Sequence, residues 1–180
     1  MNFEEHISNL LYPIFINLIS SFIFLFALLH FLRPKFKIVP FIAKTQSPFK
    51  DSNDPCFAFK VINKSYFGTF DVHAKVYSYK ILQGENKIIN KVISPIFLKT
   101  EKVNFVARNK FFNKNYGDNC IQFFTYEDLF YLLKNRNYIE FQITAKHSLT
   151  GLNSINTYEF VNPNLIRIGN FKSGNIEEII

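Results

Sequence analysis

The sequence is poor in cysteine. Cys56 and Cys120 are the two cysteines among its 180 residues, and they form no Cys-x-x-Cys pair. No cluster of histidines lies beside either of them in the sequence. Zinc sites and disulfide-stapled folds need several such residues at short spacing, so the sequence predicts neither. We expect both thiols to be free and buried.

The sequence also lacks the motifs of common enzyme chemistry. It has no nucleophile elbow, Walker loop, dinucleotide-binding fingerprint or zinc-protease helix. The run Asp51-Ser52-Asn53-Asp54 offers oxygen ligands, but it lacks the glycine and distal glutamate of a calcium loop and is expected to be a turn. His147, near the end of a predicted strand, is expected to be structural. We therefore predict no catalytic residue, metal or cofactor, and a protein that is not an enzyme.

Basic residues are absent before position 33. All 21 Lys and Arg lie at or after Arg33, together with 12 of the 14 acidic residues, so this part carries a net charge of +9. A basic domain can bind nucleic acid or anionic lipid, and a domain tied to a bilayer meets the lipid first. We expect lipid contact and no nucleic acid. A biased codon composition, rich in Lys, Asn, Ile and Phe, is the alternative explanation for the charge.

Charge is also absent from Leu10 to Leu32. This run has 23 residues, enough to cross the roughly 30 Å hydrocarbon layer as a helix. Its acidic start and its length exclude a secretory signal peptide. Glu4 and Glu5 precede the run, whereas five basic residues follow it within about 20 positions, so the positive-inside rule predicts a cytoplasmic C-terminal part. We expect a single-pass protein of the cell inner membrane with its N-terminus outside.

Polar residues interrupt this apolar run. Asn17, Ser20, Ser21 and Phe24 recur at helical spacing and are predicted to share one face. Such a face can form hydrogen bonds with a second helix, or line a water-filled path if several copies assemble. The alternative is that an asparagine and two serines are tolerated in lipid because their side chains bond back to the helix.

Beyond the run, apolar and polar residues alternate, which is typical of half-buried strands. Phe57, Phe59 and Val61 are predicted to share one buried face. In the next stretch, residues 70, 72, 74 and 76 are predicted to point inward. The clearest stretch places Ile139, Phe141, Ile143 and Ala145 inward over eight residues. Less regular candidates are 37–43, 88–98, 103–107, 155–161 and pieces around Ile166 and Ile176.

One short helix is predicted among these strands. Thr125-Tyr126-Glu127-Asp128 resembles a capping box, and an apolar run follows it up to Asn135. The pattern favours an all-β fold: an immunoglobulin-like β-sandwich with one short helix, preceded by a transmembrane helix. We expect a short tail at 1–9, the membrane helix at 10–32, a basic juxtamembrane segment with the first strand at 33–55, and a cytoplasmic sandwich at 56–180.

Three segments resemble the inward-rectifier potassium channels. Phe31-Leu32-Arg33-Pro34-Lys35 is similar to the end of their inner helix, and Phe57–Asn63 is similar to a strand in which an apolar-basic run ends in Asn. The stretch from Phe141 to Phe171 is similar to a strand, a Thr-Gly turn, a second strand and a Gly-x-Phe. The resemblance implies an immunoglobulin-like cytoplasmic domain. It does not extend to potassium selectivity, because the nine residues before Leu10 are too few to supply an outer helix and a filter.

The resemblance also implies lipid contacts. Arg33 and Lys35 match positions that meet anionic headgroups in that family, and Lys37 extends the group. A stop-transfer cluster that only fixes topology is the alternative use of these residues.

Two functions are compatible with these features. The first is a non-enzymatic, membrane-anchored sensor or binding module on the cytoplasmic side that oligomerises with its own kind and recognises an unidentified ligand or protein. The second is a membrane-disrupting or pore-forming effector that is triggered through the β-domain, as in bacterial defence systems.

Overall fold

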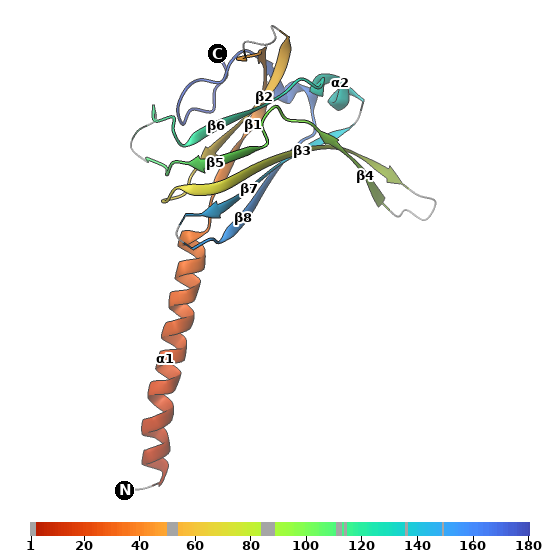
Figure 1. Cartoon of the computed structure of the whole chain (residues 1–180). Helices are drawn as coiled ribbons and strands as arrows, with labels where there is room; N and C mark the ends of the chain where they lie inside the picture. Colours follow the sequence, from red (N-terminus) through yellow and green to blue (C-terminus); the bar gives the residue numbers. More distant parts are fainter. Residues whose placement is uncertain are drawn as a thin grey trace.

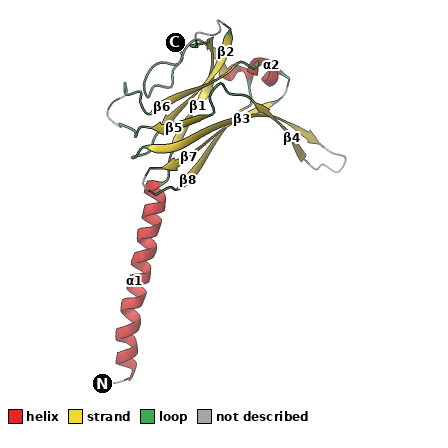
Figure 2. Ribbon diagram, viewed as in Figure 1, coloured by secondary structure: helices red, strands yellow, loops and turns green. Residues whose placement is uncertain are grey.

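The computed structural model describes residues 3–49, 54–83, 89–110, 113, 115–135, 137–148 and 150–180. One long helix leads into a β-rich domain, and the helix projects from the domain as a separate rod (Figures 1 and 2). The predicted turn at 51–54 lies, apart from Asp54, outside the described residues. The elements of the domain are β1 (Phe36–Gln46), β2 (Pro55–Asn63), β3 (Thr69–Gln83), β4 (Ile89–Ile96), β5 (Lys102–Val106), β6 (Cys120–Thr125), α2 (Leu129–Lys134), β7 (Tyr138–His147), β8 (Asn153–Phe160), a 3-10 turn η1 (Pro163–Leu165) and β9 (Ile166–Ile168).

Helix α1 (Phe3–Leu32) contains the charge-free run. Its part from Leu11 to Leu32 is 22 residues long and apolar enough to cross a membrane. The helix continues through Pro13 and ends just before Arg33-Pro34, since the residue before a proline is biased away from helical conformation. The long apolar helix that the sequence predicts is therefore confirmed.

The strands form two sheets that pack face to face. In the first sheet the strand order is β6-β2-β1-β9, and in the second it is β4-β3-β7-β8, with β5 paired to the beginning of β3. Apolar side chains from both sheets fill the space between them, and the rings of Phe59 and Phe141 stack across it with centroids 4.9 Å apart. This arrangement confirms an all-β domain built as a sandwich.

The alternation predicted for β7 is confirmed. Ile139, Phe141, Ile143 and Ala145 are buried, while the residues between them are half-buried. In β3 the prediction holds at positions 72, 74 and 76 but is wrong at Phe70, which is 45% exposed. The register of β3 against β7 shifts between Phe70 and His73, and Asp71 has a φ of 50°. This bulge turns Phe70 out of the core.

Strand β2 is buried on both faces. Phe57, Phe59 and Val61 share the face that packs on the second sheet, as predicted. The opposite face is also covered, because residues 171–180 fold back over it and Phe171 and Ile179 pack into a second, smaller core. Alternation in a sequence cannot reveal a cover that comes from a distant segment.

The short helix α2 is confirmed, but its cap differs from the predicted one. Asp128, not Thr125, is the N-cap, and its carboxylate accepts a hydrogen bond from the Tyr131 backbone N–H. Thr125 is instead the last residue of β6, an edge strand of the first sheet that the sequence reasoning missed. Cys120–Thr125 lacks clean alternation because its two adjacent phenylalanines point to opposite faces.

Candidate functional site

The polar residues of α1 lie on an uncovered helix face. Asn17, Ser20, Ser21 and Phe24 are all exposed, and the apolar stretch of the helix around them is not buried against the domain. The structure therefore places these four residues together along one stripe of the helix.

The junction between helix and domain is short and hydrogen-bonded. Arg33 and Lys35 are exposed within the three residues that separate α1 from β1. The backbone N–H of Lys35 donates to Ser65 Oγ at 2.8 Å, and the N–H of Lys64 donates to the Lys35 carbonyl at 2.8 Å. The turn between β2 and β3 is thereby fastened to the end of the helix.

Lys37 differs from its two predicted partners. It is exposed like them, but its Nζ lies 2.6 Å from a carboxylate oxygen of Glu177. The C-terminal segment thus already supplies an anionic partner for Lys37. The sequence offered no sign of this ion pair, because the two residues are 140 positions apart.

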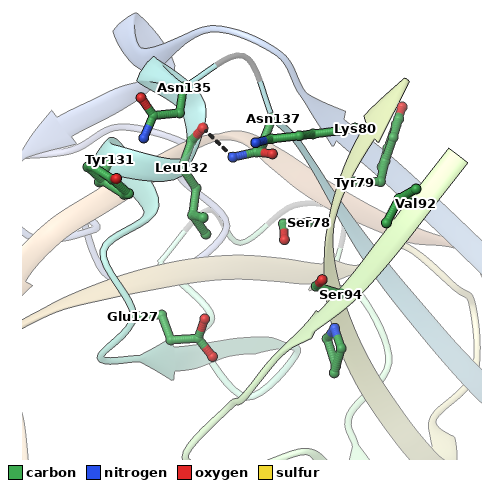
Figure 3. Close-up of a pocket in the computed structure, with 11 residues that line it drawn as sticks. Ser78, Tyr79, Lys80, Val92, Ser94, Glu127, Tyr131, Leu132, Asn135 and Asn137 are labelled. Atoms are coloured by element: carbon green, nitrogen blue, oxygen red, sulfur yellow. Dashed lines mark hydrogen bonds between the residues drawn. The ribbon is translucent and has the colours of Figure 1, made fainter. Parts of the chain in front are cut away.

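A polar pocket of about 700 Å³ opens between the β3–β4 hairpin and α2 (Figure 3). Ser78 and Ser94 are register partners on β3 and β4 and both line this pocket. The opposite wall comes from α2 and the segment after it, where Asn137 donates through Nδ2 to the Leu132 carbonyl at 3.0 Å. The remaining lining residues are Tyr79, Lys80, Val92, Pro95, Glu127, Tyr131 and Asn135.

The pocket presents hydroxyls, amides and one charge of each sign. Lys80 and Glu127 both line it, and Glu127 Oε1 accepts a hydrogen bond from the Phe97 N–H at 2.8 Å. Such a lining can bind a small polar molecule by hydrogen bonds. The sequence reasoning missed this pocket, because its walls come from three separate stretches that show no motif.

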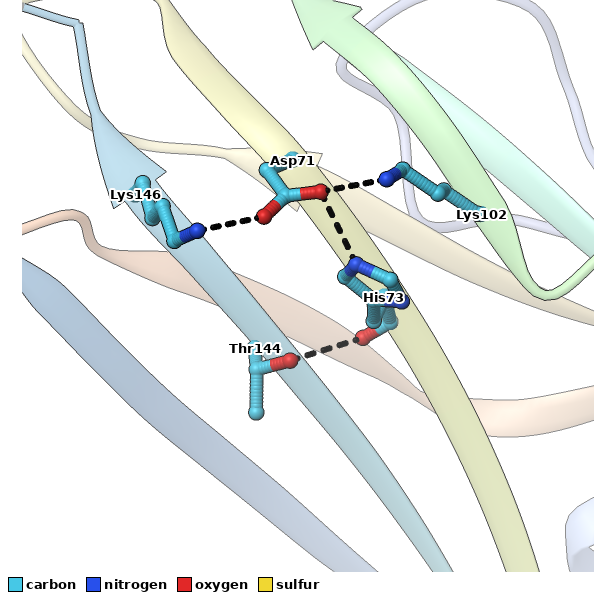
Figure 4. A network of polar contacts seen from close by, with 5 residues as sticks. All are labelled: Asp71, His73, Lys102, Thr144 and Lys146. Carbon is cyan, nitrogen blue, oxygen red and sulfur yellow. Dashed lines mark hydrogen bonds and ion pairs between the residues drawn. The ribbon is translucent and has the colours of Figure 1, made fainter.

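A second polar cluster centres on Asp71 (Figure 4). Its carboxylate lies 2.8 Å from Lys102 Nζ and 2.7 Å from Lys146 Nζ, and it accepts a hydrogen bond from His73 Nε2 at 2.9 Å. The bonds to Lys102, Lys146 and His73, in that order of effect, lower the pKa of Asp71 below its usual range. The acid stays ionised while the surrounding groups leave a local excess of positive charge.

A third cluster fixes the C-terminal segment. Lys60 in β2 is 1% exposed, and its ammonium donates to the carbonyls of Lys172, Gly174 and Ile176 at 2.6, 2.7 and 2.8 Å. Burial lowers the pKa of Lys60. The basic residue of the apolar-basic run in β2 thus acts as a clamp for this segment.

Both thiols are free, as expected, but only Cys56 is fully buried. Cys120 is half-buried beside the C-terminal segment, and burial raises the pKa of both thiols. Among the described residues, no group of three or more His, Cys, Asp or Glu side chains is arranged to hold a metal ion.

No protein-family model and no curated protein matches the chain. Among solved structures, the chain is similar to a crystal structure assigned as the ApaA protein of Bordetella pertussis. That match has 7% identity and a TM-score of 0.35, and it covers 71% of this chain and 92% of the other. None of these three comparisons identifies a family.

Proposed function

We propose that the chain is a non-enzymatic, membrane-anchored binding module. Helix α1 crosses the cell inner membrane once, with the N-terminus outside, and the β-domain lies in the cytoplasm, where it oligomerises. The observation that carries this proposal is the uncovered helix. The apolar part of α1 is not buried against the domain, and the hydrophobic core of the domain forms without any residue of α1. So much apolar surface exposed to water would be strongly unfavourable, whereas lipid receives it readily.

Flotation after alkaline extraction tests the anchor. The full chain is reconstituted into phosphatidylcholine–phosphatidylglycerol vesicles, washed at high pH to remove peripheral proteins, and floated on a density gradient. We expect it to float with the vesicles. A variant carrying Leu18→Lys and Phe22→Lys is the matched comparison and is expected to sediment, because two charges near the bilayer centre cost several kcal/mol. Release of the unaltered chain contradicts the proposal.

The polar pocket between the β3–β4 hairpin and α2 is the proposed ligand site. Its hydroxyls, amides, Lys80 and Glu127 favour a small polar molecule that carries both acceptors and donors. In a screen of polar fragments by ligand-observed NMR, we expect Ser94→Phe to remove binding by filling the pocket. Val161→Phe, at an exposed position outside the pocket, is the control and should leave binding intact. Equal binding to both variants would place the ligand elsewhere.

We further propose that the sandwich is of immunoglobulin type and related to the cytoplasmic domain of inward-rectifier channels. Two features support this. Phe57–Asn63 lies in β2, inside the first sheet, and the stretch from Phe141 forms the β7–turn–β8 hairpin whose turn contains Thr150-Gly151. The relation concerns the domain only.

A second candidate function is a pore-forming or membrane-disrupting effector triggered through the β-domain. The observation in its favour is the exposed stripe of Asn17, Ser20 and Ser21 on α1. Replacing these three residues with Leu should abolish ion flux through reconstituted vesicles. Ile19→Leu with Phe26→Leu, on the opposite helix face, is the control. Unchanged flux excludes this face as a pore lining, and a monomeric mass by light scattering in detergent excludes a pore of several copies.

A further inference from the structure

Four aromatic side chains are exposed together at one end of the domain. Tyr66 and Phe67 belong to the β2–β3 turn, Phe70 follows at the start of β3, and Phe105 lies on β5. Their exposed fractions are 54%, 36%, 45% and 52%. We name these residues the aromatic cluster. Aromatic side chains grouped in this way on a surface indicate a site of contact with a membrane or with another protein.

Close packing holds the cluster together. The rings of Phe70 and Phe105 lie with centroids 5.0 Å apart. Phe105 also lies across Gly68, where an added Cβ would come within 2.5 Å of the ring. A side chain at position 68 would therefore displace the ring, so Gly68 lets the turn and β5 present one continuous aromatic surface.

Hydrogen bonds give the turn a defined shape. The Ser65 N–H donates to Asn63 Oδ1 at 2.9 Å, and Asn63 Nδ2 donates to the Ala107 carbonyl at 2.9 Å. The Asn109 N–H donates to the Ser65 carbonyl at 3.0 Å. Tyr66 and Phe67 are thus carried on a turn that is braced from both sides.

The cluster lies next to the end of α1. The turn is bonded to Lys35, three residues after the last residue of the helix, and three extended residues span at most about 11 Å. The start of β3 pairs with the end of β7, and Figure 1 shows the β7–β8 end of the sheet beside the top of α1. The headgroup layer is about 5–8 Å thick on each side of the hydrocarbon. When α1 crosses a bilayer, the turn that carries Tyr66 and Phe67 therefore lies close to the headgroup layer.

The charges around the cluster match an anionic surface. Lys35 and Lys64 flank the turn, Lys146 on β7 is the register partner of Phe70, and Lys102 on β5 is the register partner of His73. The nearby acid, Asp71, is already paired with both Lys102 and Lys146. Aromatic residues rimmed by lysines are the composition of surfaces that insert into the membrane interface.

We propose that the aromatic cluster inserts into the interface of the bilayer that α1 crosses, so that the domain lies on the membrane in one fixed pose. The proposal rests on the membrane anchoring of the proposed function. The occupant is the lipid surface itself, because the cluster is continuous with the helix end and cationic around its rim. A second copy of the chain is the competing occupant.

Tryptophan fluorescence tests this contact, because the natural sequence contains no tryptophan. Phe67→Trp and Tyr66→Trp each report from the cluster. Phe31→Trp in α1 is the positive control, and Tyr131→Trp, an exposed residue of α2 at the far side of the domain, is the negative control. Each full-length variant is reconstituted into phosphatidylcholine–phosphatidylglycerol vesicles with lipids brominated near the headgroup, and circular dichroism checks that it is folded.

We expect brominated lipid to quench Phe67→Trp and Tyr66→Trp by roughly twofold or more and to leave Tyr131→Trp unchanged. Quenching of Phe31→Trp without quenching of either cluster variant overturns the inference while the anchor stands. A blue-shifted but unquenched emission at the cluster overturns it in favour of a protein partner. Absence of quenching at Phe31→Trp shows instead that the anchor itself has failed.

Discussion

At the scale of single residues, the buried ammonium of Lys60 and the buried ring of His147 carry the clearest consequences. Both lie on strands, both are almost wholly shielded from water, and both have a pKa lowered by burial. They differ in the segment that they stabilise. Lys60 donates hydrogen bonds to the C-terminal segment, whereas His147 accepts a hydrogen bond from the turn between β7 and β8.

Replacing Lys60 with Met should loosen the C-terminal segment. The change leaves three carbonyls without their charged donor, and a hydrogen bond to a charged group contributes about 1.5–3 kcal/mol. We expect the free energy of unfolding to fall by about 2 kcal/mol, and residues 171–180 to be cut early in limited proteolysis. Lys172→Met, which removes only an exposed ion pair to Glu178, should change stability by less than about 0.5 kcal/mol. Equal effects of the two changes would refute the clamp.

Because His147 is buried, we expect the folded protein to lose stability in mild acid. Its Nδ1 accepts a hydrogen bond from the Thr150 N–H at 3.3 Å, and burial lowers its pKa below the ordinary value of about 6.5. The unfolded chain therefore takes up a proton at a higher pH than the folded chain, so stability is complete above about pH 6.5 and falls as the pH drops below it. Denaturation midpoints at a series of pH values measure this slope.

His147→Gln should flatten that slope. His73→Gln, at a half-buried histidine bonded to Asp71, is the control and should keep it. If the slope persists without His147, another group is responsible for the acid sensitivity.

At the scale of elements, α2 depends on its N-cap. A helix of six residues has few internal hydrogen bonds, so the bond from the Tyr131 N–H to Asp128 Oδ1 matters for its formation. Asp128→Ala should lower the free energy of unfolding by about 1 kcal/mol, while Asp128→Asn, which keeps an acceptor, should cost much less. Urea denaturation compares the two. Because α2 forms one wall of the polar pocket, the alanine variant should also weaken the binding of any ligand there.

The elements also show how far sequence patterns reach. The sequence predicts the alternation of β7 and the apolar run of α1 correctly. In each case a regular sequence pattern corresponds to a single structural environment along the whole element. Phe70 was placed wrongly because a bulge shifts the register after it, and β6 was missed because Phe123 and Phe124 are adjacent and both apolar. Neither a bulge nor an edge strand without alternation leaves a clear mark in a sequence.

The candidate sites were harder to predict than the strands. Arg33 and Lys35 can be proposed as lipid contacts from the sequence because they adjoin the apolar run, and this assignment stays a prediction. The polar pocket and the aromatic cluster are each assembled from elements far apart in the chain, and register sets their geometry. Lys37 was assigned to lipid, and its ion pair with Glu177 depends on where the C-terminal segment folds.

At the scale of the whole molecule, the chain consists of an apolar helix, whose exposure to water would be unfavourable, and a domain whose hydrophobic core forms without that helix. Hydrogen bonds at Lys35 couple the two parts, and the domain end nearest the helix carries the exposed aromatic residues. The proposed anchoring at a bilayer, through the helix that precedes β1, is consistent with both features.

Protease accessibility tests this account most directly. The full chain is expressed in a bacterium, and inverted inner-membrane vesicles, whose cytoplasmic face points outward, are treated with protease. We predict that the β-domain is digested while a membrane-protected peptide containing α1 remains, and that intact spheroplasts protect the domain. A domain that resists protease in inverted vesicles until detergent is added, or a chain recovered in the soluble fraction, would contradict the account.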